Sequence, residues 1–171
     1  MLGLVSIEAQ VERDFDRALT KALLHRLRDW LWRDSTHENY LLSFEEAKGA
    51  LARWTQVYRG MKTVDVEKIR GSVGRYRDFD GAFLPNKVSM GDRWSRIDRA
   101  YHRGDELPAV SLYKIGNAYF VRDGNHRVSV ARYHGVAAID AEVVEIRDRW
   151  SGGGGVATGS PVRTRAVLAA S

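Results

Sequence analysis

Apolar residues recur at helical spacing through the first part of the chain. Val11, Phe15, Leu23 and Leu27 lie three to four residues apart or at multiples of that spacing, with charged residues between them. An apolar stripe of this period is typical of an amphipathic helix, here predicted from about residue 8 to residue 34.

A second helix is predicted from a capping signal. Ser43 stands three residues before Glu46, the spacing of a capping box, and Leu51 and Tyr58 continue a helical period toward Gly60. Residues 1–60 are therefore predicted to form a helical N-terminal extension. Its apolar stripe needs a surface to bury against, and either the rest of the chain or a second copy, as a homodimer through these helices, would supply one.

After residue 60 the pattern changes to short elements separated by glycine and proline. Alternating apolar residues predict strands, a 3.6-residue period predicts helices, and Gly-Asn at 116–117 predicts a hairpin turn. The sequence predicts strands near 63–66, 108–114, 118–122 and 139–146 and helices near 92–102 and 128–133. Residues 61–148 are thus predicted to form an α+β domain, and the glycine-rich residues 149–171 a flexible tail.

Composition narrows the class of protein. The chain has 171 residues, 44% of them hydrophobic and 29% charged, and it has no cysteine. This excludes disulfides and thiol chemistry, and it favours a cytoplasmic protein. No apolar run approaches the ~18 residues of a membrane-spanning helix, so no membrane partner is expected.

The formal net charge of +5 is unevenly distributed. Lys and Arg balance Asp and Glu over residues 1–60, exceed them by two over residues 61–148, and exceed them by three in the last 23 residues. Most of the excess lies in the tail, which is weak support for a DNA-binding face.

The run from Asp123 to Arg127 joins a predicted strand to a predicted helix. The first N–H groups of a helix lack intrahelical acceptors, and the helix dipole adds positive charge, so phosphate settles there. Gly124 permits a close backbone approach, and Arg127 offers a bidentate guanidinium. His126 could donate or shuttle a proton, and Asp123 could accept one or bind a metal ion. These residue types predict a phosphate site.

A purely structural interpretation of the same run stays open. Asp-Gly is a common turn pair, and Asn125 could simply cap the helix that follows. His126 could be solvated, and Arg127 could pair with Glu142 or Glu145.

The block from residue 107 to residue 145 resembles the ParB/sulfiredoxin superfamily. The resemblance rests on Leu-Pro-Ala-Val-Ser-Leu-Tyr-Lys, on Tyr-Phe-Val-Arg-Asp-Gly-Asn-His-Arg and on Ile-Asp-Ala-Glu-Val-Val, with Val64-Asp-Val-Glu-Lys-Ile as an opening element. It extends over residues 61–148. It implies a ParB/sulfiredoxin-like α+β fold with a small mixed sheet. It also implies that the glycine turn, Gly124 and Asn125 included, holds nucleotide phosphates: CTP in partition proteins, ATP in sulfiredoxins and ADP in free-serine kinases, with Mg²⁺ as a possible companion.

Three variants of the motif differ within the turn. Partition proteins have Gly-Glu-Arg-Arg, where only Gly124 and Arg127 match. Sulfiredoxins have Gly-Gly-Cys-His-Arg, and Asn125 stands at their catalytic cysteine, which excludes thiol-based repair. Free-serine kinases have Asp-Gly-His-His-Arg, which differs from this chain only at Asn125. By that resemblance Asp123 and His126 would be catalytic.

The resemblance also implies residues outside the turn. The loop after the first strand lines the nucleotide pocket in ParB-like domains, so Arg75 and Arg77 would contact the ligand. The alternative for both is local pairing with aspartates on the surface. Free-serine kinases use a further glutamate, for which Glu67, Asp78 and Asp80 are the candidates.

Two other sets of residues favour plain interpretations. Arg93, Arg96, Arg99 and Arg103 share one edge of the helix at 92–102, where a solvated face is favoured over contact with DNA phosphates. The histidines have no spacing typical of a metal site, so none is predicted.

Three functions remain in competition. A nucleotide-dependent hydrolase or small-molecule phosphotransferase is favoured by Asp123, His126 and Arg127. A DNA-associated partition- or nuclease-like module, and a non-catalytic nucleotide-sensing domain, are the alternatives.

Overall fold

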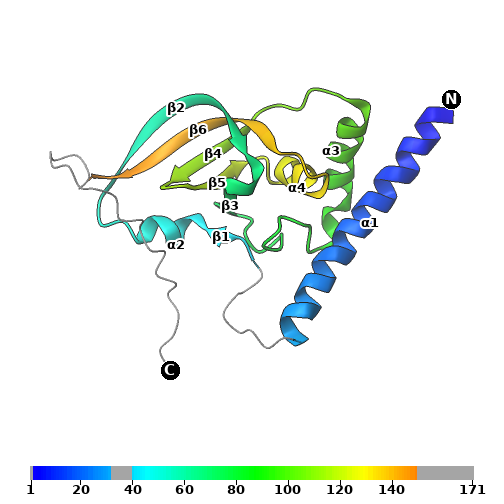
Figure 1. Cartoon of the computed structure of the whole chain (residues 1–171), viewed down its shortest axis with the longest axis horizontal. Helices are drawn as coiled ribbons and strands as arrows, with labels where there is room; N and C mark the ends of the chain where they lie inside the picture. The colour runs from blue at the N-terminus through cyan, green and yellow to red at the C-terminus, as the bar shows by residue number, and fades with distance from the viewer. Residues whose placement is uncertain (1, 32–39, 150–171) are drawn as a thin grey trace.

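The computed structural model describes residues 2–31 and 40–149, with side chains for residues 6–27 and 40–149. Over these residues the fold is α+β, with one six-stranded mixed sheet and a long N-terminal helix (Figure 1). The helices are α1 (Leu2–Leu31), α2 (Phe44–Gly49), α3 (Gly91–Arg103) and α4 (Asn125–Tyr133), with short 3-10 turns η1 (Val66–Lys68) and η2 (Val88–Met90). None of the helices in these ranges is both long and apolar enough to cross a membrane. The predicted tail lies outside the described residues, except for Arg149.

The sheet brings two loops to one edge. Its strands are β1 (Leu42–Ser43), β2 (Trp54–Asp65), β3 (Ile69–Ser72), β4 (Val110–Ile115), β5 (Ala118–Asp123) and β6 (Ala138–Asp148). They lie in the order β1-β3-β5-β4-β6-β2. β3 and β5 are parallel neighbours, while β5 and β4 form an antiparallel hairpin. The loops that follow β3 and β5 therefore leave the sheet at the same edge, the place where open sheets with parallel strands bind ligands.

Alternate residues of the strands face opposite sides of the sheet. Leu112 and Val121 face α4 and pack with Val128 in the main core. Their neighbours Tyr113 and Phe120 face the other side, where Phe44 of α2 stacks on Tyr113 with ring centroids 4.6 Å apart. This two-residue alternation is why the strands beyond residue 107 were predictable from the sequence.

Helices cover the main-core face in successive layers: α4 lies against the sheet, α3 packs on α4, and α1 lies outermost against α3 (Figure 1). Trp94 is fully buried between Phe15 of α1 and Tyr133 of α4, with ring centroids 5.6 and 5.5 Å away. Its indole N–H donates to Ser129 Oγ at 2.9 Å, so its one polar atom is satisfied.

The prediction of a second helix reaching residue 58 was wrong. Ser43 does cap α2, whose Glu46 amide donates to its Oγ, but the helix ends at Gly49. Residues 54–65 form β2, which pairs along its length with β6 and bulges between Tyr58 and Gly60. The boundary expected at residue 60 thus falls inside a strand. The backbone N–H and C=O groups of this segment form their hydrogen bonds with β6. The helical spacing of a few apolar residues had predicted a helix there instead.

The predicted stripe on the first helix was only partly right. Val11 and Phe15 are buried, but the buried face continues through Ala18 and Ala22, and Leu23 is 56% exposed. Leu24 and Leu27 are also about half exposed. Small residues let α1 approach α3 closely, whereas the sequence pattern gives weight to large apolar ones.

Candidate phosphate-binding site

The turn between β5 and α4 is built around one glycine. Gly124 is the N-cap of α4 and has a φ of +103°, and a Cβ at this position would lie 2.7 Å from Val110 Cγ1. The first intrahelical bond is the one that the Val128 amide donates to Gly124 O at 3.0 Å. No side chain in the described part of the chain caps the helix. The amides of residues 125–127 therefore have no intrahelical acceptor, as the phosphate interpretation requires.

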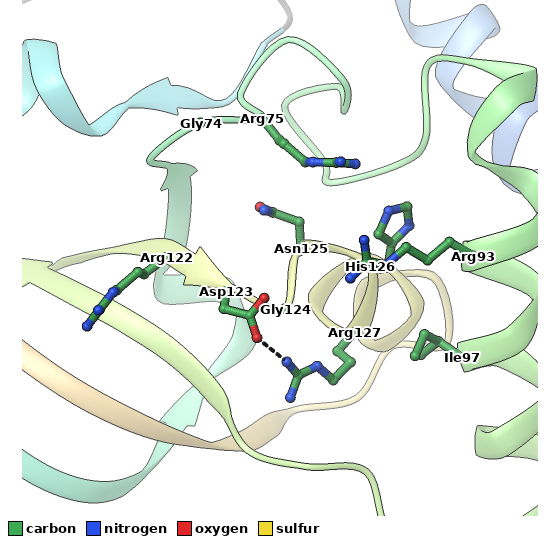
Figure 2. Close-up of a pocket in the computed structure, with 10 residues that line it drawn as sticks. All are labelled: Gly74, Arg75, Arg93, Ile97, Arg122, Asp123, Gly124, Asn125, His126 and Arg127. Atoms are coloured by element: carbon green, nitrogen blue, oxygen red, sulfur yellow. Dashed lines mark hydrogen bonds and ion pairs between the residues drawn. The ribbon is translucent and has the colours of Figure 1, made fainter.

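Asn125 does not cap the helix, contrary to the purely structural interpretation. It follows the N-cap, and Figure 2 shows its side chain directed toward the Gly74 loop. Its Oδ1 is buried and has no hydrogen-bond partner in the described part of the chain. A buried carbonyl oxygen without a donor is costly, so a ligand N–H or O–H or a bound water would be favourable here.

Two neighbouring cavities, of about 220 and 340 Å³, open beside the turn. Both are lined by Arg75, Arg93 and His126, and Figure 2 shows the residues that line the first of them. Over the two cavities five cationic side chains (Arg75, Lys87, Arg93, Arg122, Arg127) face two carboxylates (Asp78, Asp123). The lining is therefore positive, which suits an anionic ligand.

His126 is the buried centre of this lining. It is 6% exposed, its ring packs edge-on to Phe79, and neither Nδ1 nor Nε2 has a hydrogen-bond partner among the described residues. Burial, and after it the positive charges of Arg93 and Arg75, lower the pKa of His126 to about 4. The ring is therefore neutral at pH 7, with one N–H to donate and one nitrogen to accept.

The structure brings Arg75 to the cavities but not Arg77. Ser72 at the end of β3 positions the loop, because its Oγ donates to Val121 O and accepts from the Arg75 amide at 3.4 Å. The Arg75 side chain is 47% exposed, and its ion-pair partner, the Asp78 carboxylate, is 3.9 Å away. Arg77 instead lies over the Tyr76 ring and lines neither cavity.

Arg93 is a lining residue that the sequence did not identify. It was interpreted as part of a solvated helix edge, an interpretation that fits Arg99, which pairs with Glu8 of α1 at 2.5 Å. Arg93 has no ion-pair partner among the side chains of residues 6–27 and 40–149 and lines both cavities. Only the packing of α3 on α4 places it beside His126, and no sequence signal carries that information.

Arg127 holds the turn together in this structure. Its Nη1 donates to Pro108 O at 2.5 Å and to Ala109 O at 2.7 Å, and its Nη2 donates to Asp123 Oδ2 at 2.7 Å (Figure 2). The Arg127 side chain is 15% exposed and Asp123 is 69% exposed. The alternative pairing with Glu142 or Glu145 does not occur. A phosphate contact from Arg127 would have to replace one of these bonds or use a remaining N–H.

Of the three candidates for a further catalytic carboxylate, only one lies at the cavities. Glu67 pairs with Arg132, near the opposite end of α4 from the turn. Asp80 is fully buried and accepts from the amides of Ala82 and Leu84, a structural role. Asp78 alone of the three lines a cavity, where it pairs with Lys87 at 2.6 Å.

His126 gives a testable dependence of stability on pH. Because its pKa falls from an ordinary 6.5 to about 4 on folding, the unfolded chain binds a proton between these pH values and the folded chain does not. The free energy of unfolding should fall as pH drops from 6.5 toward 4, by at most about 3 kcal/mol from this group. His126→Gln should remove that part of the loss. Urea denaturation of both chains at pH 7, 5.5 and 4 measures the difference, and parallel pH profiles would contradict the assignment.

No family model and no curated protein matches this sequence. Among solved structures the chain is similar to a sulfiredoxin from Arabidopsis thaliana, with a TM-score of 0.37 and 13% sequence identity, over 48% of this chain and 82% of that one. At this TM-score the likeness carries no further argument. Membership of the ParB/sulfiredoxin superfamily stays a prediction from the sequence motif.

Proposed function

We propose that the chain binds a nucleotide through its phosphates at the β5–α4 turn and acts on it as a hydrolase or phosphotransferase. The observation that carries the proposal is His126, buried and neutral between Arg75 and Arg93 at the start of a helix, with no hydrogen-bond partner for either ring nitrogen among the described residues. A phosphate group would accept hydrogen bonds from the imidazole N–H and from both guanidinium groups.

Charge favours the same ligand. Arg93 has no carboxylate partner in the described ranges, and Arg75 has only the distant one on Asp78. Two arginines beside a helix N-terminus repel each other until an anion lies between them. A bound phosphate would also favour the protonated form of His126, because its charge would offset the positive charges of Arg93 and Arg75 that, after burial, lower the pKa of this ring.

A magnesium ion would come with the ligand. The two cavity carboxylates, Asp78 in the loop after β3 and Asp123 at the end of β5, each pair with a cation, so they form no preassembled metal site. Mg²⁺ usually binds nucleotide phosphates together with one or two protein carboxylates. Asp123, exposed at the rim of the first cavity, is the one adjacent to the turn.

The test is calorimetric titration with CTP, ATP, ADP, GTP and inorganic phosphate, each with and without Mg²⁺. Arg93→Ala should weaken the binding of the preferred ligand by about 10- to 100-fold, the loss expected for a charge-assisted hydrogen bond. Arg96→Ala is the matched control, because Arg96 lies one turn further along α3, is exposed and lines neither cavity.

Equal affinity in the wild type and in Arg93→Ala would overturn the site. Absence of binding by the wild type to every ligand of the panel would overturn the function. Titration with duplex DNA tests the alternative of a DNA-associated module. Binding of DNA, with no binding of any mononucleotide, would favour that class instead.

A further inference from the structure

A second cluster of polar side chains lies away from the turn, where α1, α3 and the end of α4 meet. Asp14 comes from α1, Asp98 and His102 from α3, and His134 follows directly after α4. One ligand atom from each lies within 4.8 Å of the other three. Asp98 is fully buried, Asp14 is 8% exposed at its side chain, and both histidines are 14% exposed.

We infer that these four side chains form a structural site for a divalent transition-metal ion of the zinc class. His102 Nε2 lies 2.9 Å from Asp14 Oδ2 and 3.6 Å from Asp98 Oδ2, and His134 Nε2 lies 2.6 Å from Asp98 Oδ1. A tetrahedral zinc ion with bonds of about 2.0–2.1 Å would set its ligand atoms ~3.3 Å apart. Small side-chain shifts would bring the cluster to that spacing.

The unsatisfied atom in the cluster points to a ligand. The Asp98 carboxylate has no exposed surface, and its Oδ2 has no hydrogen-bond partner in the described part of the chain. A buried carboxylate oxygen left without a partner is costly. A cation between Asp98 and the two imidazoles would satisfy it and use the neutral nitrogen of each ring.

Charge balance also favours a dication. Two largely buried carboxylates bring two negative charges to the cluster, and only two imidazolium ions could balance them from within it. The His102 and His134 rings are edge to face with centroids 5.2 Å apart, so two positive rings would repel each other. One divalent ion with both imidazoles neutral balances the carboxylates without like charges in contact.

Neighbouring side chains hold the ligands in place. The Tyr133 hydroxyl donates to Asp14 Oδ1 at 3.0 Å, which leaves Oδ2 facing His102. Tyr101 stacks on the His134 ring at 4.2 Å. Such outer contacts are typical of metal sites, where they fix the orientation of the ligands.

The sequence carried one trace of this site. Asp98 and His102 are four residues apart on α3 and therefore share one helix face. Spacing among histidines alone did not reveal it, because the other ligands come from positions 14 and 134. Four protein ligands and no open position indicate a structural ion that fastens α1 to α3 and α4.

The test uses the full chain without an affinity tag, stripped by a chelator and titrated with CoCl2 and then ZnCl2. One Co²⁺ per chain with the strong visible absorption of tetrahedral coordination is expected, displaced by one Zn²⁺, together with a rise in Tm. Replacing a ligand, in Asp98→Asn or His134→Ala, should weaken zinc binding by ~100-fold or more. His25→Ala is the control, since His25 pairs with Asp80 outside the cluster.

A measurement without mutation covers variants that fail to fold. Histidine side-chain nitrogen shifts in the wild type should change on zinc addition at His102 and His134 and not at His126. The site is overturned if neither zinc nor cobalt binds stoichiometrically to the wild type. It is also overturned if binding is unchanged in a folded His102→Ala/His134→Ala chain. Neither outcome touches the nucleotide proposal, whose residues lie at the other end of α4.

Discussion

Deleting residues 1–39 is expected to leave a chain that no longer folds stably. The deletion removes the α1 side of the cluster around Trp94, where Phe15, Ala18 and Ala22 are buried against α3 and α4. Losing one large aromatic side chain from a core costs about 3–5 kcal/mol, and the deletion removes several buried groups at once. That loss is comparable with the whole stability of a typical domain, about 5–15 kcal/mol.

Point variants make the same test quantitative. Phe15→Ala should lower the free energy of unfolding by about 3–5 kcal/mol, measured by urea denaturation with chelator present so that metal binding does not contribute. Leu23→Ala is the control on the same helix; at 56% exposed it should change stability by about 0.5 kcal/mol or less. A fragment of residues 40–171 that is monomeric and as stable as the full chain would contradict the packing of α1.

The contrast between Phe15 and Leu23 shows what periodicity can and cannot predict. The helical period established that α1 is a helix. It could not identify the buried face, because α1 has apolar residues on more than one side. The face with small residues is the one that packs against α3. Gly91 is part of that fit, since a Cβ there would lie 3.0 Å from the Phe15 ring. The homodimer through the N-terminal helices stays a prediction, and the exposed leucines of α1 are the apolar surface that it would use.

β2 was missed for a related reason. Leu51, Trp54 and Tyr58 fit a helical period, yet Trp54 and Tyr58 are exposed side chains of a strand. Their strand state comes from hydrogen bonds to β6, about ninety residues later in the chain. Sheet pairing between such distant segments leaves no local signal. The hairpin β4–β5 was predictable because its strands and turn are adjacent in sequence.

The turn at residues 123–127 was located from sequence because strand, glycine and helix follow one another. Its surroundings were not. Arg93 reaches the turn through helix packing, and Asp78 through a loop that leaves the sheet beside β5. Arg127, the expected phosphate ligand, donates three hydrogen bonds within the protein, to Pro108 O, Ala109 O and Asp123 Oδ2. Local sequence thus predicts the element that could present an anion site, and tertiary packing decides which cations surround it.

The largest expected effect on activity is at Asp123. Phosphoryl transfer mainly requires positioning and charge neutralisation, which the start of α4, Arg75 and Arg93 could supply. It also needs a group that orients the attacking hydroxyl or water, and a carboxylate beside the phosphate suits this task. Asp123 is exposed at the cavity rim and held by Arg127 at 2.7 Å. Asp123→Asn keeps the shape of the side chain and removes its charge.

We expect Asp123→Asn to lower kcat for nucleotide hydrolysis or transfer by at least about 100-fold while nucleotide affinity changes much less. His126→Ala should lower both affinity and kcat, because the neutral ring would contact the phosphate and, once the anion raises its pKa, could pass a proton. Asp92→Asn is the control, an exposed carboxylate on α3 that lines neither cavity. The measurement is release of phosphate or nucleoside diphosphate, with binding checked in each variant.

Turnover in Asp123→Asn equal to wild type would show that Asp123 has no catalytic role. A wild type that binds nucleotide but turns over none, with any acceptor supplied, would make the domain a nucleotide sensor, because the anion site would then exist without a group that activates the nucleophile.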